Sequence, residues 1–262
     1  MFSEPSIASI NHQFDEKNSE SFSSLRDGIH IEWPVDGGLS RKVVRRSNYR
    51  ITGKYPSLKA GRMLHWESEA ERKVMVMLDF CPAVSLFQEQ PAIIHYKTND
   101  GWHRHYPDLL VHGDGQTEFW EVKPDLAHAD DETLVRSRLL EARLPTHGYH
   151  YRLVFANELA RAPRLPNAIR LLAYCKYSID PLAQEQSLLQ FADIPTLTWG
   201  ELTASSCTVH PEPTLARMIL GGQLHFNTDT LLTDQTEIYW VKDQTIFKEQ
   251  TWASLISKKD HG

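Results

Sequence analysis

The stretch YPDLLVHGDGQTEFWEVKP, residues 106–124, decides the fold that this sequence predicts. The stretch includes the second half of one strand-like run, 103–111, and the whole of another, 117–123. The segment HGDGQ (112–116) between them is a strong signal for a β-hairpin turn. We therefore expect two antiparallel neighbours in a sheet.

The hairpin predicts which side chains meet. In a strand, side chains two residues apart share a face, so Glu121 and Lys123 point the same way. Trp120 and Val122 then face the other layer. The turn brings Asp108 on the partner strand beside Glu121. Two carboxylates and one ammonium are thus expected on one sheet face.

The segments around the hairpin predict an α/β core with a mixed sheet. Residues 67–79 have helical spacing of apolar side chains, and 84–88 and 92–97 are strand-like. A capped helix is expected over 131–144. The apolar run 151–156 follows a helix, so we expect a strand parallel to a neighbour.

The ends of the chain differ in character from this core. Residues 1–38 are rich in Ser, Asn and Asp and are expected to form a loosely ordered lead-in, and 39–166 to form the core domain. Residues 167–262 are expected to form an α+β module resembling a winged helix. Its expected helices are 167–178, 182–192, 199–204 and 213–220, and its expected hairpin pairs 224–227 with 237–241.

The composition limits which classes of protein this chain can belong to. The chain of 262 residues is 41% hydrophobic and 24% charged, which fits a globular fold with a real core. It has no apolar run near the roughly 18 residues of a membrane span and no secretory leader. Cys81, Cys175 and Cys207 fit neither a disulfide framework nor a CxxC zinc site. We therefore expect a cytoplasmic bacterial protein, associated with the nucleoid and not with a membrane.

One segment is strongly basic although the net charge is −6. It holds eight cations and no Asp or Glu: Arg41, Lys42, Arg45, Arg46, Arg50, Lys54, Lys59 and Arg62. Such a cluster matches the footprint of a nucleic-acid backbone. The alternative is a solvated basic face.

The residues of the hairpin suit phosphodiester hydrolysis. That reaction needs a metal to neutralise charge, an activated water and carboxylates that hold the metal. Mg²⁺ commonly uses one or two protein carboxylates. Asp108 and Glu121 supply them, and Lys123 supplies an ammonium that can orient or deprotonate the water. The spacing alone arises by chance on the order of once per chain, but Pro107 and the hairpin make it more specific. The alternative is an exposed strand face with solvated side chains.

A third carboxylate is expected from the preceding helix. Glu67 and Glu71 are four residues apart on one face, and Glu71 is placed near the middle of the helix against its apolar side. Charge on Glu67 and Glu69, nearer the helix start, is explained by the helix dipole. The histidines lack HExxH spacing, and His103 and His105 are expected to face DNA or water. The sequence has neither GxSxG nor a P-loop.

Five short motifs, taken in order, resemble a known family. They are GKYPSLK (53–59), ESEAE (67–71), FQEQP (87–91), YPD (106–108) and EVKP (121–124). Together they resemble TnsA, the endonuclease subunit of heteromeric transposases of the Tn-seven type. The resemblance covers residues 40–156.

The resemblance implies a restriction-endonuclease-like fold and Mg²⁺, which we expect as two ions replaceable by Mn²⁺. It implies cleavage of the 5′ strands at transposon ends, together with a DDE transposase (TnsB-like) and an AAA+ ATPase (TnsC-like). Glu71, Asp108, Glu121 and the Val122 carbonyl are then expected to hold metal, and Lys123 to position the attacking water. Some members have Gln where this chain has Glu121.

Two other functions fit the same residues. One is a stand-alone restriction or repair endonuclease, which would cleave DNA without a transposase. The other is a catalytically silent subunit that bridges DNA within the transposase complex.

Overall fold

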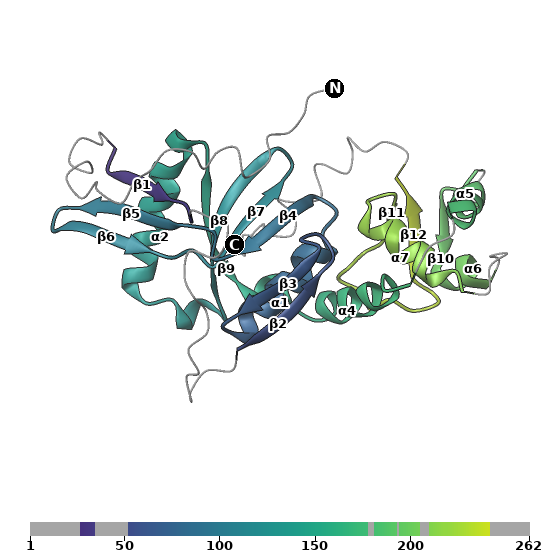
Figure 1. Cartoon of the computed structure of the whole chain (residues 1–262). Coiled ribbons are helices and arrows are strands. Elements are labelled where there is room, and N and C mark those ends of the chain that lie inside the picture. Colours follow the sequence, from purple (N-terminus) through teal and green to yellow (C-terminus); the bar gives the residue numbers. More distant parts are fainter. Residues whose placement is uncertain (1–26, 35–51, 178–180, 193, 205–209, 242–262) are drawn as a thin grey trace, which may run out of the picture.

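The computed structural model describes residues 27–34, 52–177, 181–192, 194–204 and 210–241 (Figure 1). The strands are β1 (Ile29–Glu32), β2 (Gly53–Ser57), β3 (Arg62–Trp66), β4 (Val84–Glu89), β5 (Ile93–Thr98), β6 (Gly101–His105), β7 (Leu109–Gly113), β8 (Gln116–Lys123), β9 (His150–Phe155), β10 (Thr196–Thr198), β11 (Leu224–His225) and β12 (Glu237–Trp240). The helices are α1 (Glu69–Phe80), η3 (Leu126–His128), α2 (Asp131–Arg143), η4 (Leu144–His147), α3 (Ala156–Leu159), α4 (Arg164–Tyr174), α5 (Pro181–Leu189), α6 (Trp199–Ala204) and α7 (Glu212–Leu220).

The central sheet has the order β4-β7-β8-β9. β4 pairs with β7 and β7 with β8 in antiparallel fashion, whereas β8 and β9 are parallel. The α/β class, the hairpin over 112–116 and the parallel last strand are therefore confirmed. The parallel pairing requires a crossover, and α2 supplies it.

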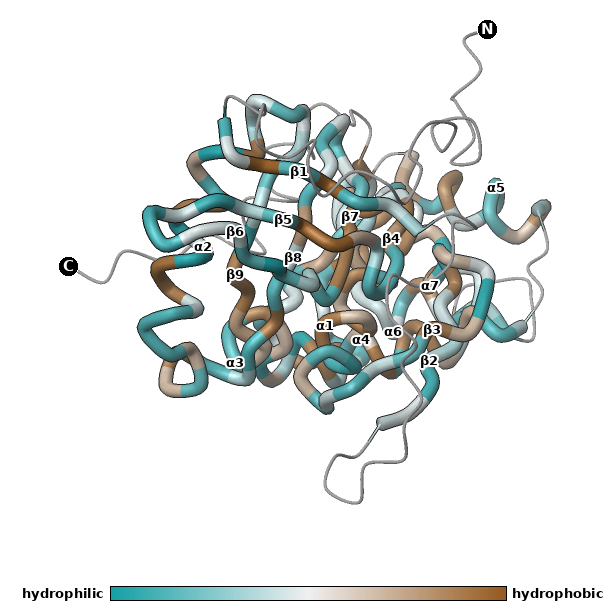
Figure 2. Tube along the Cα trace, turned by 60° about the vertical axis from the view of Figure 1, so that its left-hand side comes forward, coloured by the Kyte–Doolittle hydropathy of each residue, from teal (hydrophilic) through white to brown (hydrophobic). Residues whose placement is uncertain are grey.

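The two faces of this sheet are covered differently. Leu109, Val111, Trp120 and Val122 belong to one hydrophobic cluster together with α1. Leu110, Phe119 and Tyr151 point to the other face, where they pack with residues of α2, β1 and β5. Figure 2 shows hydrophobic, brown segments gathered where β7 and α1 lie. The alternation expected from the sequence thus holds over both strands of the hairpin.

The expected strand 103–111 is wrong as a single element. β6 ends at His105 and β7 begins at Leu109, and the two strands belong to different sheets. Pro107 between them has no N–H to donate to a ladder and a fixed φ, which favours such a break. Asp108 therefore lies where the chain passes from one sheet into the next.

Three strands lie in segments where the sequence predicted none. Ile29–Glu32, inside the expected lead-in, forms β1 and pairs with β5, so those residues are not loosely ordered. β2 and β3 form a separate hairpin that packs near α1. Residues 1–26 and 35–38 of the lead-in lie outside the described residues.

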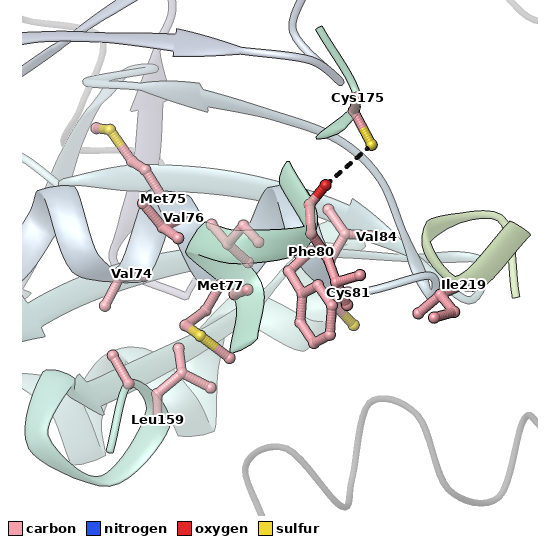
Figure 3. Packing of buried hydrophobic residues seen from close by; sticks show 14 of the residues in the cluster. Val74, Met75, Val76, Met77, Phe80, Cys81, Val84, Leu159, Cys175 and Ile219 are labelled. Atoms are coloured by element: carbon pink, nitrogen blue, oxygen red, sulfur yellow. Dashed lines mark hydrogen bonds between the residues drawn. The ribbon is translucent and has the colours of Figure 1, made fainter. Parts of the chain in front are cut away.

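The segment after residue 166 shares its core with the preceding part. α5, α6 and α7 accompany a small sheet of order β10-β12-β11, in which the β11–β12 pairing was expected and β10 was not. Figure 3 shows Ile219 of α7 and Cys175 in one cluster with Phe80 and Cys81. Among the described residues, no helix combines the length and apolar character that a membrane crossing requires.

Candidate nuclease centre

Asp108 and Glu121 are cross-strand neighbours, as the hairpin predicts. Leu109 pairs with Trp120, which places the preceding Asp108 opposite Glu121. The Asp108 amide donates to the Trp120 carbonyl over 2.9 Å. The Asp108 Oδ2 in turn accepts a hydrogen bond from the Val122 amide at 2.7 Å. The backbone of β8 thus fixes this carboxylate at the entrance to β7.

Glu121 and Lys123 share a face, also as predicted. The Lys123 Nζ lies 2.5 Å from the Glu121 Oε1. The Glu121 side chain is only 7% exposed, whereas the Lys123 side chain is 26% exposed. Glu121 is therefore an interior carboxylate, and the solvated strand face considered as an alternative does not describe it.

Glu71 lies in the first turn of α1 and not near its middle. Ser68 is the N-cap residue, so the helix begins at Glu69, two residues later than expected. The Glu71 Oε1 accepts a hydrogen bond from the Ser68 hydroxyl at 2.8 Å. The Glu71 Oε2 accepts one from the Glu67 amide at 2.9 Å. Glu71 thus stabilises the helix start in addition to any role at the site.

Glu71, Asp108 and Glu121 form what we call the acidic cluster. Burial raises the pKa of Asp108 well above its usual range, and negative charge on Glu121 and Glu71 raises it further. Burial also raises the pKa of Glu71, to which the charges of Glu67 and Glu121 contribute. The three carboxylates therefore repel one another in a weakly solvated space.

Three further side chains surround Glu121, and the sequence predicted none of them for this site. His105 at the end of β6 places its Nε2 3.5 Å from the Glu121 Oε2. Arg136 of α2 places its Nη2 3.7 Å from the Glu121 Oε1. The Tyr151 hydroxyl of β9 shares a hydrogen bond of 2.9 Å with His105 Nε2.

His105 contributes no positive charge to this group. It is 5% exposed, so the expectation that it faces DNA or water is wrong. Burial, together with the charges of Arg136 and Lys123, lowers the pKa of His105 to about 3. The neutral imidazole therefore contacts Glu121 as a polar neighbour, and Lys123 and Arg136 are the cations.

The acidic cluster has the donor chemistry for a hard divalent cation, because it supplies carboxylate oxygens that repel one another. Within the described ranges, no three His, Cys, Asp or Glu side chains form a ready-made group for a metal ion. Mg²⁺ commonly needs only one or two protein carboxylates, with water and substrate phosphate supplying the remaining ligands. The pair Asp108 and Glu121 fits that requirement.

Gln90, which follows β4, is hydrogen-bonded to Asp108 and to Glu67. Its backbone adopts a positive φ of 43°. The Gln90 amide donates to the Asp108 carbonyl at 2.8 Å, and its side-chain Nε2 donates to the Glu67 Oε1 at 3.0 Å. The FQEQP segment therefore joins α1 to the strand break that carries Asp108.

The GKYPSLK segment anchors the other end of α1. Asp79 is fully buried, and its carboxylate accepts hydrogen bonds from the Tyr55 and Ser57 hydroxyls at 2.7 and 2.9 Å. The backbone amides of Leu58 and Lys59 each donate to the same carboxylate at 3.0 Å. This hairpin turn is thus locked onto the helix.

The expected DNA-contacting cations have different surroundings. Arg41, Lys42, Arg45, Arg46 and Arg50 lie outside the described residues. Lys54 is exposed on β2.

Lys59 and Arg62 are engaged within the chain. The Lys59 Nζ donates to the carbonyls of Leu78 and Cys81 at the end of α1, and burial lowers its pKa to about 8. Arg62 makes a bidentate contact of 2.9 and 2.7 Å with the buried Glu89. The Lys59 ammonium therefore caps the end of α1, and contact of Lys59 with DNA stays a prediction.

A cavity of about 340 Å³ lies away from the acidic cluster. Lys59 of the β2–β3 turn, Asp79 of α1, Gln184 of α5 and Arg217 of α7 are among its lining residues. The acidic cluster contributes no residue to it. The cavity and the candidate centre are therefore separate features of the fold.

Comparisons with known proteins identify no family. A scan against models of protein families finds no match, and a search of curated proteins finds none. Among solved structures, the protein VC1899 from Vibrio cholerae is similar at 18% identity with a TM-score of 0.24. The matched region covers 37% of this chain and 27% of that chain.

Proposed function

We propose that this chain is a Mg²⁺-dependent DNA endonuclease. The observation that carries the proposal is the placement of Asp108 opposite Glu121, with Lys123 2.5 Å from Glu121, at a break between two sheets. The central sheet supports a restriction-endonuclease-like core, because its strands β4, β7 and β8 follow α1 and its last strand, β9, follows α2 and is parallel to β8.

The residues of the centre have distinct roles in this proposal. Asp108, Glu121 and the Val122 carbonyl would hold Mg²⁺, which supplies charge neutralisation and an acidified water when bound. Glu71, whose two oxygens already accept hydrogen bonds, acts at the edge of the site. Lys123 orients the attacking water, because its ammonium is partly exposed beside Glu121.

We further propose that the chain is a TnsA-like subunit that cuts the 5′ strands at transposon ends, alongside a DDE transposase and an AAA+ ATPase. The support is that the resembling motifs have connected roles around α1. ESEAE begins the helix, GKYPSLK fastens its end, and FQEQP joins it to Asp108. The proposal includes a winged-helix-like role for the last module, supported by the β10-β12-β11 sheet beside its helices.

DNA contact is proposed for the exposed Lys54 and for the basic residues 41–50 outside the described ranges. Arg62 is a weaker contributor, since both ends of its guanidinium already bind Glu89. Contacts of this kind to phosphates carry no sequence information and make binding depend strongly on salt.

The test is a reconstituted transposition reaction with Mg²⁺, using end-labelled transposon DNA and the two partner classes. With Asp108→Ala, 5′-strand cleavage should disappear, whereas DNA binding and 3′-strand cleavage should remain. Undiminished 5′-strand cleavage would overturn the assignment. Wild-type cleavage without either partner would instead favour the stand-alone nuclease.

A further inference from the structure

The guanidinium of Arg136 reaches the acidic cluster from α2. Figure 1 shows α2 beside the sheet that carries the candidate centre. The Arg136 Nη2 lies 3.7 Å from the Glu121 Oε1, and the side chain is only 14% exposed. Its Nη2 also donates to Thr133 Oγ1 at 3.2 Å, while its Nε is buried without a hydrogen-bond partner among the described residues.

The positive charge of Arg136 compensates an excess of acid. Glu71, Asp108 and Glu121 face two nearby cations, Lys123 and Arg136. Glu132, a second carboxylate that pairs with Arg136, has an 82% exposed side chain, so water screens that pair. Of these two carboxylates, Glu121 is therefore the interior partner of Arg136.

We propose that Arg136 is a resident counter-charge that competes with the metal for Glu121 and thereby weakens metal binding by the free protein. The inference rests on the proposed function, because it concerns the metal site of that nuclease. A guanidinium and a divalent cation neutralise the same carboxylate, so each lowers the affinity of the site for the other. A nuclease with such a competitor is restrained until substrate phosphate adds its own ligands.

A purely structural role for Arg136 makes a different prediction. α2 is already anchored by Leu140, which is fully buried against the sheet, and its start is capped by Asp130. If Arg136 served only to hold the helix, its removal would loosen the site and weaken metal binding. The sign of the change in metal affinity therefore separates the two roles.

The experiment is a calorimetric titration of the full chain with Mg²⁺ alone, and in parallel with Mn²⁺ alone. Arg136→Gln should lower the dissociation constant about fivefold or more. Arg136→Lys keeps the charge and should stay near wild type. Arg138→Gln on the exposed face of the same helix is the matched control and should leave affinity unchanged. Arg136→Met, which keeps the apolar stem, replaces Arg136→Gln if that variant does not fold.

Two failures are distinguishable. Unchanged or weaker metal binding in the uncharged Arg136 variants, with normal binding in wild type, overturns the counter-charge and leaves the proposed nuclease intact. Absence of metal binding in wild type and in the uncharged Arg136 variants alike, equal to that in Asp108→Asn, overturns the proposed nuclease and this inference with it.

Discussion

Asp79 of α1 and Asp108 at the entrance to β7 are two carboxylates with opposite surroundings. Asp79 accepts hydrogen bonds from two hydroxyls and two backbone amides, so its buried charge is well compensated. Asp108 accepts a hydrogen bond from the Val122 amide and faces the negative charges of Glu71 and Glu121. Asp79 thus serves the fold, whereas the repulsion around Asp108 costs stability. Uncompensated acids in a weakly solvated site are typical of functional centres.

The largest expected effect is on catalysis. Lys123→Ala should slow 5′-strand cleavage by about 10²–10⁴-fold, because the water loses the group that orients it. The free energy of unfolding should fall only modestly, because the Lys123 side chain is partly exposed and Arg136 remains as a counter-charge to Glu121. Cleavage rates at matched folded concentration provide the measurement. A rate near wild type would remove Lys123 from the site.

Asp79→Ala should instead lower the stability of the fold and leave the cleavage rate unchanged. It leaves the Tyr55 and Ser57 hydroxyls and two backbone amides without their acceptor, so the free energy of unfolding should fall by about 2–4 kcal/mol. Urea unfolding measures this loss, and Asp79→Asn should lose less. Cleavage per folded molecule should stay at the wild-type rate. If Asp79→Ala were as stable as wild type and lost cleavage, Asp79 would not be the purely stabilising carboxylate described above.

The local part of the site was predictable from sequence. The alternation of Glu121 and Lys123, and the position of Asp108 across the hairpin, follow from strand periodicity and a short turn. His105 and Arg136 were not predictable, because separate elements bring them to Glu121 only in the folded chain.

Parts of the fold were also not predictable from the sequence. Pro107 split an expected strand, and Ser68 shifted the start of α1 and so moved Glu71 into its first turn. The basic neighbours of Lys59 in the sequence predict a surface cation, yet its ammonium binds carbonyls at the end of α1. A charge pattern alone does not tell a solvated cation from one that caps a helix.

The smallest expected effect is at an exposed, paired carboxylate. A hydrogen bond from Arg164, aided by Arg161, lowers the pKa of Asp229 to about 2. Because this folded-state pKa lies below the unfolded value of about 3.9, the stabilisation is complete above that value and is lost as pH falls toward 2.

The Asp229 side chain is 41% exposed, so screening limits the contribution to about 1 kcal/mol or less. Urea midpoints of wild type and Asp229→Asn should therefore differ slightly at pH 6 and converge as the pH falls below about 4. A difference that grows on acidification would contradict the assigned pairing.

The most direct test of the central claim compares two identical substitutions in one hairpin. Asp108→Asn alters the proposed metal ligand, and Asp114→Asn alters the turn, where Asn tolerates the positive φ of 48°. With Mg²⁺ and both partner classes present, the 5′-strand nicking rate should be lost in Asp108→Asn and retained in Asp114→Asn. Equal nicking by the two folded variants would contradict a nuclease centre at Asp108.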